Sequence, residues 1–186
     1  MKKHRVFIAI NLPPEIKKEL TFYQKKWENL PVRWVKEENL HLTLVFIGYA
    51  EGEDLLEIFE KTKNGAEKHQ PFFLNFQRIC LGPPKKPPRM FWVEGEKSRE
   101  MSLLKDDLSG ELGGLKRKNE VRAFKPHITL GRINIDEWRQ LPEKPKIEEK
   151  LNLVVPVNSI ELMESKLKPT GPDYFVLESI NLSKPI

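Results

Sequence analysis

The chain has little cysteine and no long apolar segment. Cys80 is the single cysteine among 186 residues, which excludes an intrachain disulfide and suits a reducing compartment. No apolar run approaches the roughly 20 residues that a membrane-spanning helix needs. Residues 1–5 are basic and residues 6–12 are apolar, but no small-residue cleavage site follows, which favours a first strand over a signal peptide. We therefore expect a cytoplasmic protein with no membrane partner.

The signatures of several enzyme classes are also missing. The sequence contains no phosphate-binding Walker loop, no dinucleotide-binding glycine fingerprint and no nucleophile elbow of the serine hydrolases. The net charge is +5, but the 27 acidic residues are mixed among 32 basic ones. Charge alone is therefore only a weak indication of a polyanionic partner such as a nucleic acid.

Two nearly identical tetrapeptides stand out against this background. They are His41-Leu42-Thr43-Leu44 and His127-Ile128-Thr129-Leu130, and they contain two of the four histidines of the chain. Residues two apart in a β-strand point to the same face, so each His would share a face with its Thr. The apolar residues between them would then face a core.

The two motifs end two similar segments of the chain. In each segment a strand is followed by a helix and then by the strand that carries His-x-Thr. His41 follows Arg5 by 36 residues, and His127 follows Arg89 by 38. We interpret this as an internal duplication of a β-α-β unit.

The apolar pattern along the whole chain predicts nine strands and four helices. The strands are expected at 5–12, 32–35, 40–48, 72–81, 89–93, 124–133, 150–155, 158–165 and 173–181. The helices are expected at 14–29, at 55–66, from the N-cap Ser98 to the stop at Gly113-Gly114, and at 136–140.

Strands outnumber helices in this pattern, and their connections suit an antiparallel α+β arrangement. No linker is long enough to separate independent domains. The sequence therefore predicts one domain over residues 1–186, built from two intertwined lobes that each contribute one His-x-Thr motif.

Two imidazoles and two hydroxyls in one cleft suit phosphate chemistry. Hydrolysis of a phosphodiester needs a base that deprotonates water and an acid that protonates the leaving alkoxide, and imidazole can serve as either near neutral pH. The attacking and leaving oxygens lie on opposite sides of phosphorus, so one His from each half suits the geometry. The Thr hydroxyls can donate hydrogen bonds to the non-bridging oxygens. A zinc site is the alternative: neither motif His has a carboxylate at ligand spacing, but a distant acidic residue could complete such a site.

Several segments of the sequence resemble the two-histidine phosphoesterase superfamily, and within it the RNA 2′,3′-cyclic phosphodiesterases, which are also called 2′-5′ RNA ligases. The resemblance spans nearly the whole chain and preserves both motifs. The segments that carry it are residues 5–10 (RVFIAI), 32–48 (VRWVKEENLHLTLVFIG), 88–93 (PRMFWV), 124–132 (FKPHITLGR), 164–167 (ESKL) and 171–174 (GPDY).

The resemblance implies a bilobal, pseudo-symmetric α+β fold, with two antiparallel sheets around a central cleft and the helices outside. It implies hydrolysis of RNA 2′,3′-cyclic phosphate ends to 2′-phosphomonoesters. The acid–base scheme requires no metal, so we expect metal-independent hydrolysis without a cofactor, and whether small cyclic nucleotides are also substrates stays open. By the same resemblance His41 is the proton donor to the 3′ leaving oxygen and His127 is the proton acceptor that activates water. Thr43, Thr129 and Arg132 would bind the phosphate. The symmetry of the sequence by itself leaves the two His roles interchangeable.

Some alternatives remain open at this point. The chain could instead join 2′-5′ RNA ends without ATP, or it could be an RNA- or nucleotide-binding module with degenerate activity. Lys85, Lys86 and Arg89, near Trp92, could hold the RNA strand, although a solvated loop beside a buried Trp is the simpler interpretation. Arg132 could equally be an ordinary surface residue. We expect a monomer.

Overall fold

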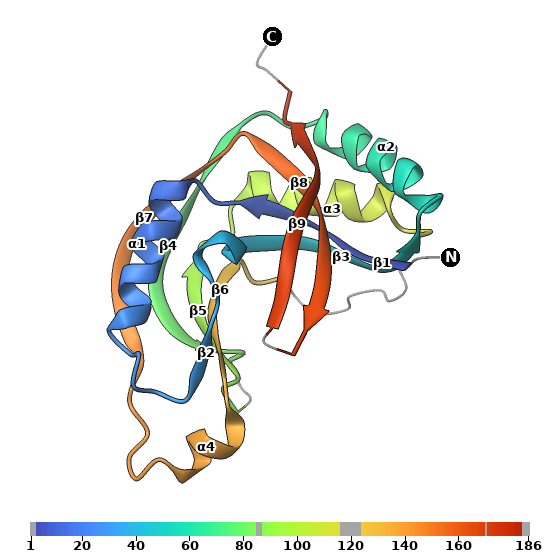
Figure 1. Cartoon of the computed structure of the whole chain (residues 1–186). Coiled ribbons are helices and arrows are strands. Elements are labelled where there is room, and N and C mark those ends of the chain that lie inside the picture. Colours follow the sequence, from blue (N-terminus) through green and yellow to red (C-terminus); the bar gives the residue numbers. More distant parts are fainter. Residues whose placement is uncertain (1–2, 85–86, 116–123, 170, 184–186) are drawn as a thin grey trace.

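The computed structural model describes residues 3–84, 87–115, 124–169 and 171–183, and its elements follow the predicted order (Figure 1). The strands are β1 (Lys3–Asn11), β2 (Val32–Trp34), β3 (His41–Glu51), β4 (Phe72–Gly82), β5 (Met90–Gly95), β6 (His127–Ile133), β7 (Glu148–Val157), β8 (Ser159–Lys168) and β9 (Gly171–Asn181). The helices are α1 (Pro14–Lys25), α2 (Asp54–Ala66), α3 (Arg99–Glu111), α4 (Ile135–Gln140) and the 3-10 turn η1 (Glu37–Asn39).

Helix boundaries follow local backbone and capping interactions. The Ser98 side chain accepts a hydrogen bond from the Met101 backbone N–H at 3.1 Å, which confirms the predicted N-cap of α3. Helix α1 ends at Lys25, earlier than the apolar spacing predicted. The Trp27 N–H bonds the Gln24 carbonyl at 3.1 Å, three residues back, so the chain tightens into turns there.

The strands form an antiparallel arrangement of the α+β class, as predicted. Hydrogen bonding runs through the order β7-β4-β5-β6-β3-β1-β8-β9, and β2 pairs with β6. Every strand pair in the described part of the chain is antiparallel. The two expected sheets are joined at one place, because β3 and β6 share the single Cα pair Leu42–Ile128. We call β3, β1, β8 and β9 the His41 lobe, and β7, β4, β5, β6 and β2 the His127 lobe.

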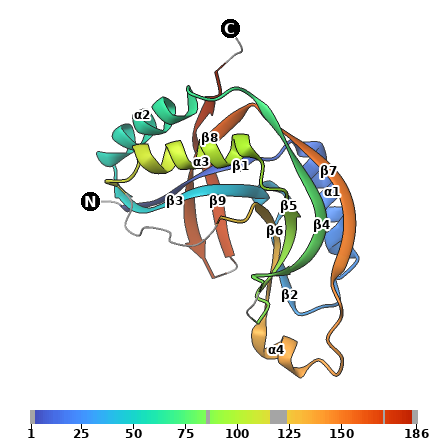
Figure 2. The same cartoon turned by 180° about the vertical axis from the view of Figure 1, so that it is seen from behind.

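The helices lie outside the two lobes, and the two duplicated segments exchange them. Helix α1 follows β1 of the His41 lobe but packs on the His127 lobe (Figures 1 and 2). Its buried Gln24 donates through Nε2 to the carbonyls of Val35 at 2.8 Å and Leu130 at 3.0 Å. Just after the helix, the ring of Trp27 lies 5.7 Å from that of Phe91. Helix α3 comes from the other segment, between β5 and β6, and packs beside α2 on β3. Each lobe therefore depends on the other segment for part of its cover.

A single large core connects the helices to both lobes. Its fully buried large side chains include Ile8, Leu42, Leu44, Phe76 and Phe91. A second, smaller apolar cluster consists of Phe7, Ala9 and Met163, with Tyr174 packed against it. Phe7 and Ala9 alternate along β1 with the core residues, so this smaller cluster lies on the opposite face of the His41 lobe. None of the described helices combines the length and the apolar character that crossing a membrane requires.

The Gln24 side chain provides a test of the helix exchange. Replacing Gln24 with Leu keeps similar bulk but leaves two partly or fully buried carbonyls without this donor. We expect the free energy of unfolding to fall by about 2 kcal/mol, measured by urea denaturation. Gln140→Leu, at the exposed end of α4, is the matched control and should change it by less than about 0.5 kcal/mol. Equal effects of the two substitutions would contradict a bridging role for Gln24.

Candidate active site

The residues of each His-x-Thr motif alternate between two faces, as the sequence predicted. The buried members are Leu42, Leu44, Ile128 and Leu130. The partly exposed members are His41, Thr43, His127 and Thr129. Because β3 and β6 run antiparallel through the Leu42–Ile128 pair, the His of one motif lies toward the Thr of the other. The two motifs thus bring two imidazoles and two hydroxyls to one face, where the lobes meet at the centre of the molecule (Figure 1).

Both imidazoles are oriented by the same backbone interaction. The Nδ1 of His41 lies 2.7 Å from the Asn39 carbonyl oxygen, and the Nδ1 of His127 lies 2.9 Å from the Lys125 carbonyl oxygen. A carbonyl only accepts, so in each ring Nδ1 carries the hydrogen and Nε2 is the atom left for chemistry. In His41, Nε2 lies 3.0 Å from the Thr43 hydroxyl, which therefore donates to the neutral ring.

The packing around the two rings differs. The His41 ring lies edge-on to Tyr174, with ring centroids 4.8 Å apart, and its centroid lies 5.1 Å from that of Phe7. The His127 ring instead stacks on Trp92, with centroids 3.9 Å apart and planes 25° from parallel. The aromatic neighbours thus break the symmetry that the two tetrapeptides suggest.

Trp92 is 6% exposed, which supports a buried role and not an RNA-stacking one. Its indole covers Gly82 of β4 so closely that a Cβ there would lie 2.2 Å from the ring. Only glycine permits this approach, and the approach holds the indole under His127. Lys85 and Lys86 lie outside the described residues, and Arg89 is exposed.

Burial lowers the pKa of His41 to about 4. The positive charges of Lys17, His127 and Arg132 act in the same direction, against the hydrogen bond to the Asn39 carbonyl. His127 and Arg132 are thus close enough to His41 for their charges to influence its pKa. In the free protein near neutral pH, His41 is therefore a neutral imidazole.

His127 also has a lowered pKa, mainly because it is buried. Arg132 and Lys125 lower this pKa further, whereas Glu94 and the bond to the Lys125 carbonyl raise it. Arg132 itself is exposed, and its guanidinium contacts the Met90 sulfur at 3.7 Å. Its positive charge lowers the pKa of both imidazoles, and its binding of a phosphate stays a prediction.

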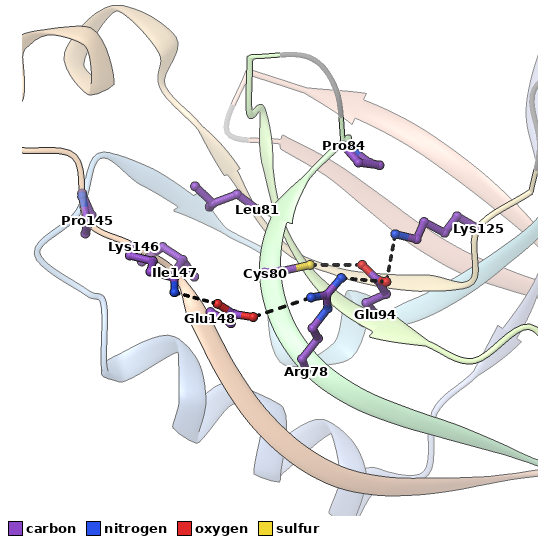
Figure 3. A pocket seen from close by; sticks show the side chains of 10 residues that line it. All are labelled: Arg78, Cys80, Leu81, Pro84, Glu94, Lys125, Pro145, Lys146, Ile147 and Glu148. Atoms are coloured by element: carbon purple, nitrogen blue, oxygen red, sulfur yellow. Dashed lines mark hydrogen bonds and ion pairs between the residues drawn. The ribbon is translucent and has the colours of Figure 1, made fainter.

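A pocket of about 360 Å³ lies on the His127 lobe (Figure 3). Its lining includes Glu94, which is the β5 partner of His127 in the sheet. Its cations are paired with carboxylates: Lys125 with Glu94 at 2.8 Å, Arg78 with Glu94 at 3.2 Å and with Glu148 at 3.7 Å, and Lys146 with Glu148 at 3.1 Å. Cys80 donates from its sulfur to Glu94 at 3.3 Å, and burial raises the thiol pKa to about 11. Cys80 is thus a protonated, unreactive thiol near neutral pH.

Sequence reasoning missed the residues that hold His41 in place. Tyr174 and Phe7 stand out in the sequence only as part of the family resemblance, and no pattern there gives Asn39 a role. The buried Asn39 side chain donates to the Pro172 carbonyl at 3.1 Å and accepts from the Tyr174 N–H at 3.2 Å, which fixes the start of β9 against His41. The only signal in the sequence is their position within the segments that carry the resemblance.

The described residues contain no group of three or more His, Cys, Asp or Glu side chains arranged to hold a metal ion. The surroundings of the two motif histidines include backbone carbonyls, a hydroxyl, aromatic rings and cations, and one carboxylate, that of Glu94, near His127.

Known proteins share this architecture and much of this sequence. The family model described as LigT like phosphoesterase matches residues 10–92. A Thermotoga maritima protein named RNA 2′,3′-cyclic phosphodiesterase is 33% identical over 180 residues, which cover 93% of this chain and 92% of that protein. A protein of the same name from Methanocaldococcus jannaschii is 30% identical over 178 residues, covering 94% and 98%. The chain belongs to the LigT-like phosphoesterases.

Solved structures agree with this assignment to the LigT-like phosphoesterases. A crystal structure of a Thermus thermophilus protein superposes with a TM-score of 0.83 at 28% identity, covering 97% of this chain and 98% of that one. The crystal structure of Escherichia coli LigT complexed with 3′-AMP has the same fold, with a TM-score of 0.81 at 24% identity and coverage of 98% and 100%. The solved structures thus show the predicted α+β fold, and the curated relatives identify this LigT-like phosphoesterase as a hydrolase.

The contact between Gly82 and Trp92 can be tested by Gly82→Ala. The added methyl group displaces the indole and with it the His127 ring, so we expect phosphodiesterase turnover to fall by up to about 100-fold while the fold is retained. Circular dichroism and steady-state kinetics measure the two effects. Gly52→Ala, where a Cβ meets nothing within 4 Å, is the control and should retain full turnover. Unchanged activity in Gly82→Ala would show that the Trp92 stack does not position His127.

The electrostatic surroundings of His41 can be tested by NMR titration of the ring protons of the four histidines. We expect His41 in the free protein to titrate at a pKa of about 4. Phosphate bound beside it stabilises the imidazolium, so saturating inorganic phosphate should raise this pKa. Arg132→Gln removes a nearby positive charge and should also raise it, without phosphate. A His41 pKa that does not respond to Arg132→Gln would place Arg132 outside the site.

Proposed function

We propose that this protein hydrolyses RNA 2′,3′-cyclic phosphate ends to 2′-phosphomonoesters by acid–base catalysis between His41 and His127. The observation that carries the proposal is the pair of imidazoles on one face, each fixed through Nδ1 by a backbone carbonyl and each therefore offering Nε2. The names of the Thermotoga maritima and Methanocaldococcus jannaschii relatives support the choice of substrate.

The reaction needs one proton taken up and one delivered. Neutral His127 accepts a proton from water through Nε2 as the water oxygen attacks phosphorus. The bond from phosphorus to the 3′ oxygen breaks on the opposite side, and protonated His41 delivers its Nε2 proton to that oxygen. The products are a 2′-phosphate and a free 3′ hydroxyl. Thr43, Thr129 and Arg132 donate to the non-bridging oxygens as negative charge accumulates there.

The lowered pKa of His41 fits this scheme when the charge of the substrate is included. In the free protein the buried ring lies among positive charges and is neutral. A phosphodiester anion in the site offsets those charges and favours the imidazolium. Binding of the substrate therefore promotes protonation of His41. The Thr43 hydroxyl, which donates to neutral His41, becomes free to turn toward the phosphate once Nε2 is protonated.

Replacement of either histidine tests the catalytic pair. We expect His41→Ala and His127→Ala each to lower kcat by about 10²- to 10⁴-fold on an RNA ending in a 2′,3′-cyclic phosphate. The double variant should be little worse than either single variant, because the two groups act in one step. His4→Gln is the control, since His4 bonds Glu164 on the other face of β1 and should leave turnover intact. Near-complete activity in either alanine variant would overturn the mechanism.

The separate roles of the two histidines can be distinguished with a modified substrate. Sulfur in place of the bridging 3′ oxygen leaves as a stable thiolate and needs no proton from the enzyme. We expect this substrate to restore turnover to His41→Ala and not to His127→Ala. Rescue of His127→Ala alone would reverse the assignment of acid and base.

The proposal of metal-independent hydrolysis is tested by running the same reaction in excess chelator. Turnover should persist, and phosphorus NMR should identify a 2′-phosphate as the product. A 5′-hydroxyl RNA added to the mixture tests the joining reaction, since a ligated product would favour the ligase alternative. Loss of activity in chelator that returns with a divalent cation would contradict the proposal.

A further inference from the structure

The proposed mechanism determines on which side of phosphorus the nucleoside lies. The leaving 3′ oxygen of a cyclic phosphate remains attached to its ribose, and it lies opposite the attacking water. If His41 protonates that oxygen and His127 activates the water, the ribose lies on the His41 side. This inference therefore rests on the proposed function. It directs the rest of the RNA strand over the His41 lobe and away from the pocket beside His127.

The His41 lobe carries an apolar surface next to its histidine. The small cluster on this face places Phe7 against His41, and the ring of Phe46 lies 6.1 Å from that of Phe7. Phe7 is 3% exposed, but Phe46 is 52% exposed. In the β1–β3 register Phe46 is the partner of Phe7, and the next exposed aromatic residue, Tyr49, is the partner of Arg5. Aromatic side chains thus extend from His41 along the lobe.

Arg5 provides a positive charge at the far end of this surface. It lies two residues from Phe7 on the same face of β1, about 7 Å further along the strand. Its guanidinium donates to the Ser165 hydroxyl at 3.4 Å and forms no ion pair with any carboxylate in the described segments. The neighbouring Glu164 bonds His4 at 2.8 Å. Residues 4 and 5 alternate along β1, so that carboxylate is held toward the face opposite Arg5.

The pocket on the His127 lobe shows the opposite pattern. Its cations Arg78, Lys125 and Lys146 are each paired with Glu94 or Glu148, so little positive charge is left for a phosphate (Figure 3). An exposed aromatic next to an uncompensated arginine is what binding of single-stranded nucleic acid requires, because bases stack on rings and phosphates pair with cations.

We propose that Phe46 and Arg5 form a second nucleotide subsite, which binds the RNA nucleotide that precedes the cyclic phosphate end. The base of this preceding nucleotide stacks on Phe46. Arg5 contacts one of the two phosphates that flank the same nucleotide, either the phosphate that joins it to the terminal nucleotide or the phosphate on its other side. The protein is then adapted to strand ends and binds them better than cyclic mononucleotides.

The subsite is tested by comparing two substrates: a 2′,3′-cyclic mononucleotide and an oligoribonucleotide with the same terminal nucleotide. The measured quantity is the ratio of kcat/KM for the oligonucleotide to that for the mononucleotide. We expect this ratio to exceed one in the unmodified protein and to fall about tenfold in Phe46→Ala, as loss of one stacked base predicts. The matched controls are Phe22→Ala, at an exposed Phe of α1, and Lys146→Gln in the His127-side pocket. Both should keep the original ratio.

Arg5 is tested by binding, which does not depend on turnover. The probe is a fluorescent oligoribonucleotide that ends in a 2′-phosphate, and its dissociation constant is measured over a range of salt concentrations. Removing one phosphate contact from a single strand should reduce the slope of log Kd against log salt by about 0.7 in Arg5→Gln. Arg139→Gln, on the exposed face of α4, should leave the slope unchanged.

The outcomes separate this proposal from the one on which it rests. Hydrolysis of both substrates with a ratio that Phe46→Ala does not change would overturn the subsite and leave the hydrolase function standing. A fall in the ratio in Lys146→Gln instead would place the strand on the His127 lobe. Turnover of neither substrate would overturn the proposed function and the subsite together.

Discussion

One backbone pairing, between Leu42 of β3 and Ile128 of β6, determines how the rest of the site is arranged. It is the only ladder pair that joins the two lobes in the described part of the chain. Both apolar residues face the common core, so their neighbours on each side must lie on the opposite face of the strands. The same pair therefore joins the sheets and places both imidazoles on one face, with the His of each motif toward the Thr of the other.

Equivalent positions acquire different chemistry through their surroundings. The two carbonyl bonds are equivalent and give both rings the same tautomer. The neighbours are not equivalent: Trp92 stacks flat on His127, whereas Tyr174 meets His41 edge-on and Lys17 adds positive charge beside it. Two histidines with different surroundings thus arise from one repeated tetrapeptide, which is what the proposed acid and base roles require.

The sequence predicted the strands and helices well, because apolar periodicity and caps such as Ser98 act locally. It predicted the faces of His41 and His127 from the alternation of the motif alone. It did not predict that α1 and α3 are exchanged between the lobes, because both arrangements bury the same apolar stripe. Nor did it identify the Asn39 bridge to β9 or the contact between Gly82 and Trp92. These join residues far apart in the chain, and no local pattern marks them.

The helix exchange bears on how such a fold can originate. A chain that carried one strand-helix-strand segment alone would have a sheet without its covering helix and only one imidazole of the proposed catalytic pair. Two copies of that chain, each lending its helix to the other, would bury both sheets and bring two histidines together across their twofold axis. Joining such copies end to end allows each half to change separately. Trp92 stacks on the His127 ring and Tyr174 lies edge-on to the His41 ring, and a symmetric dimer could not have this difference.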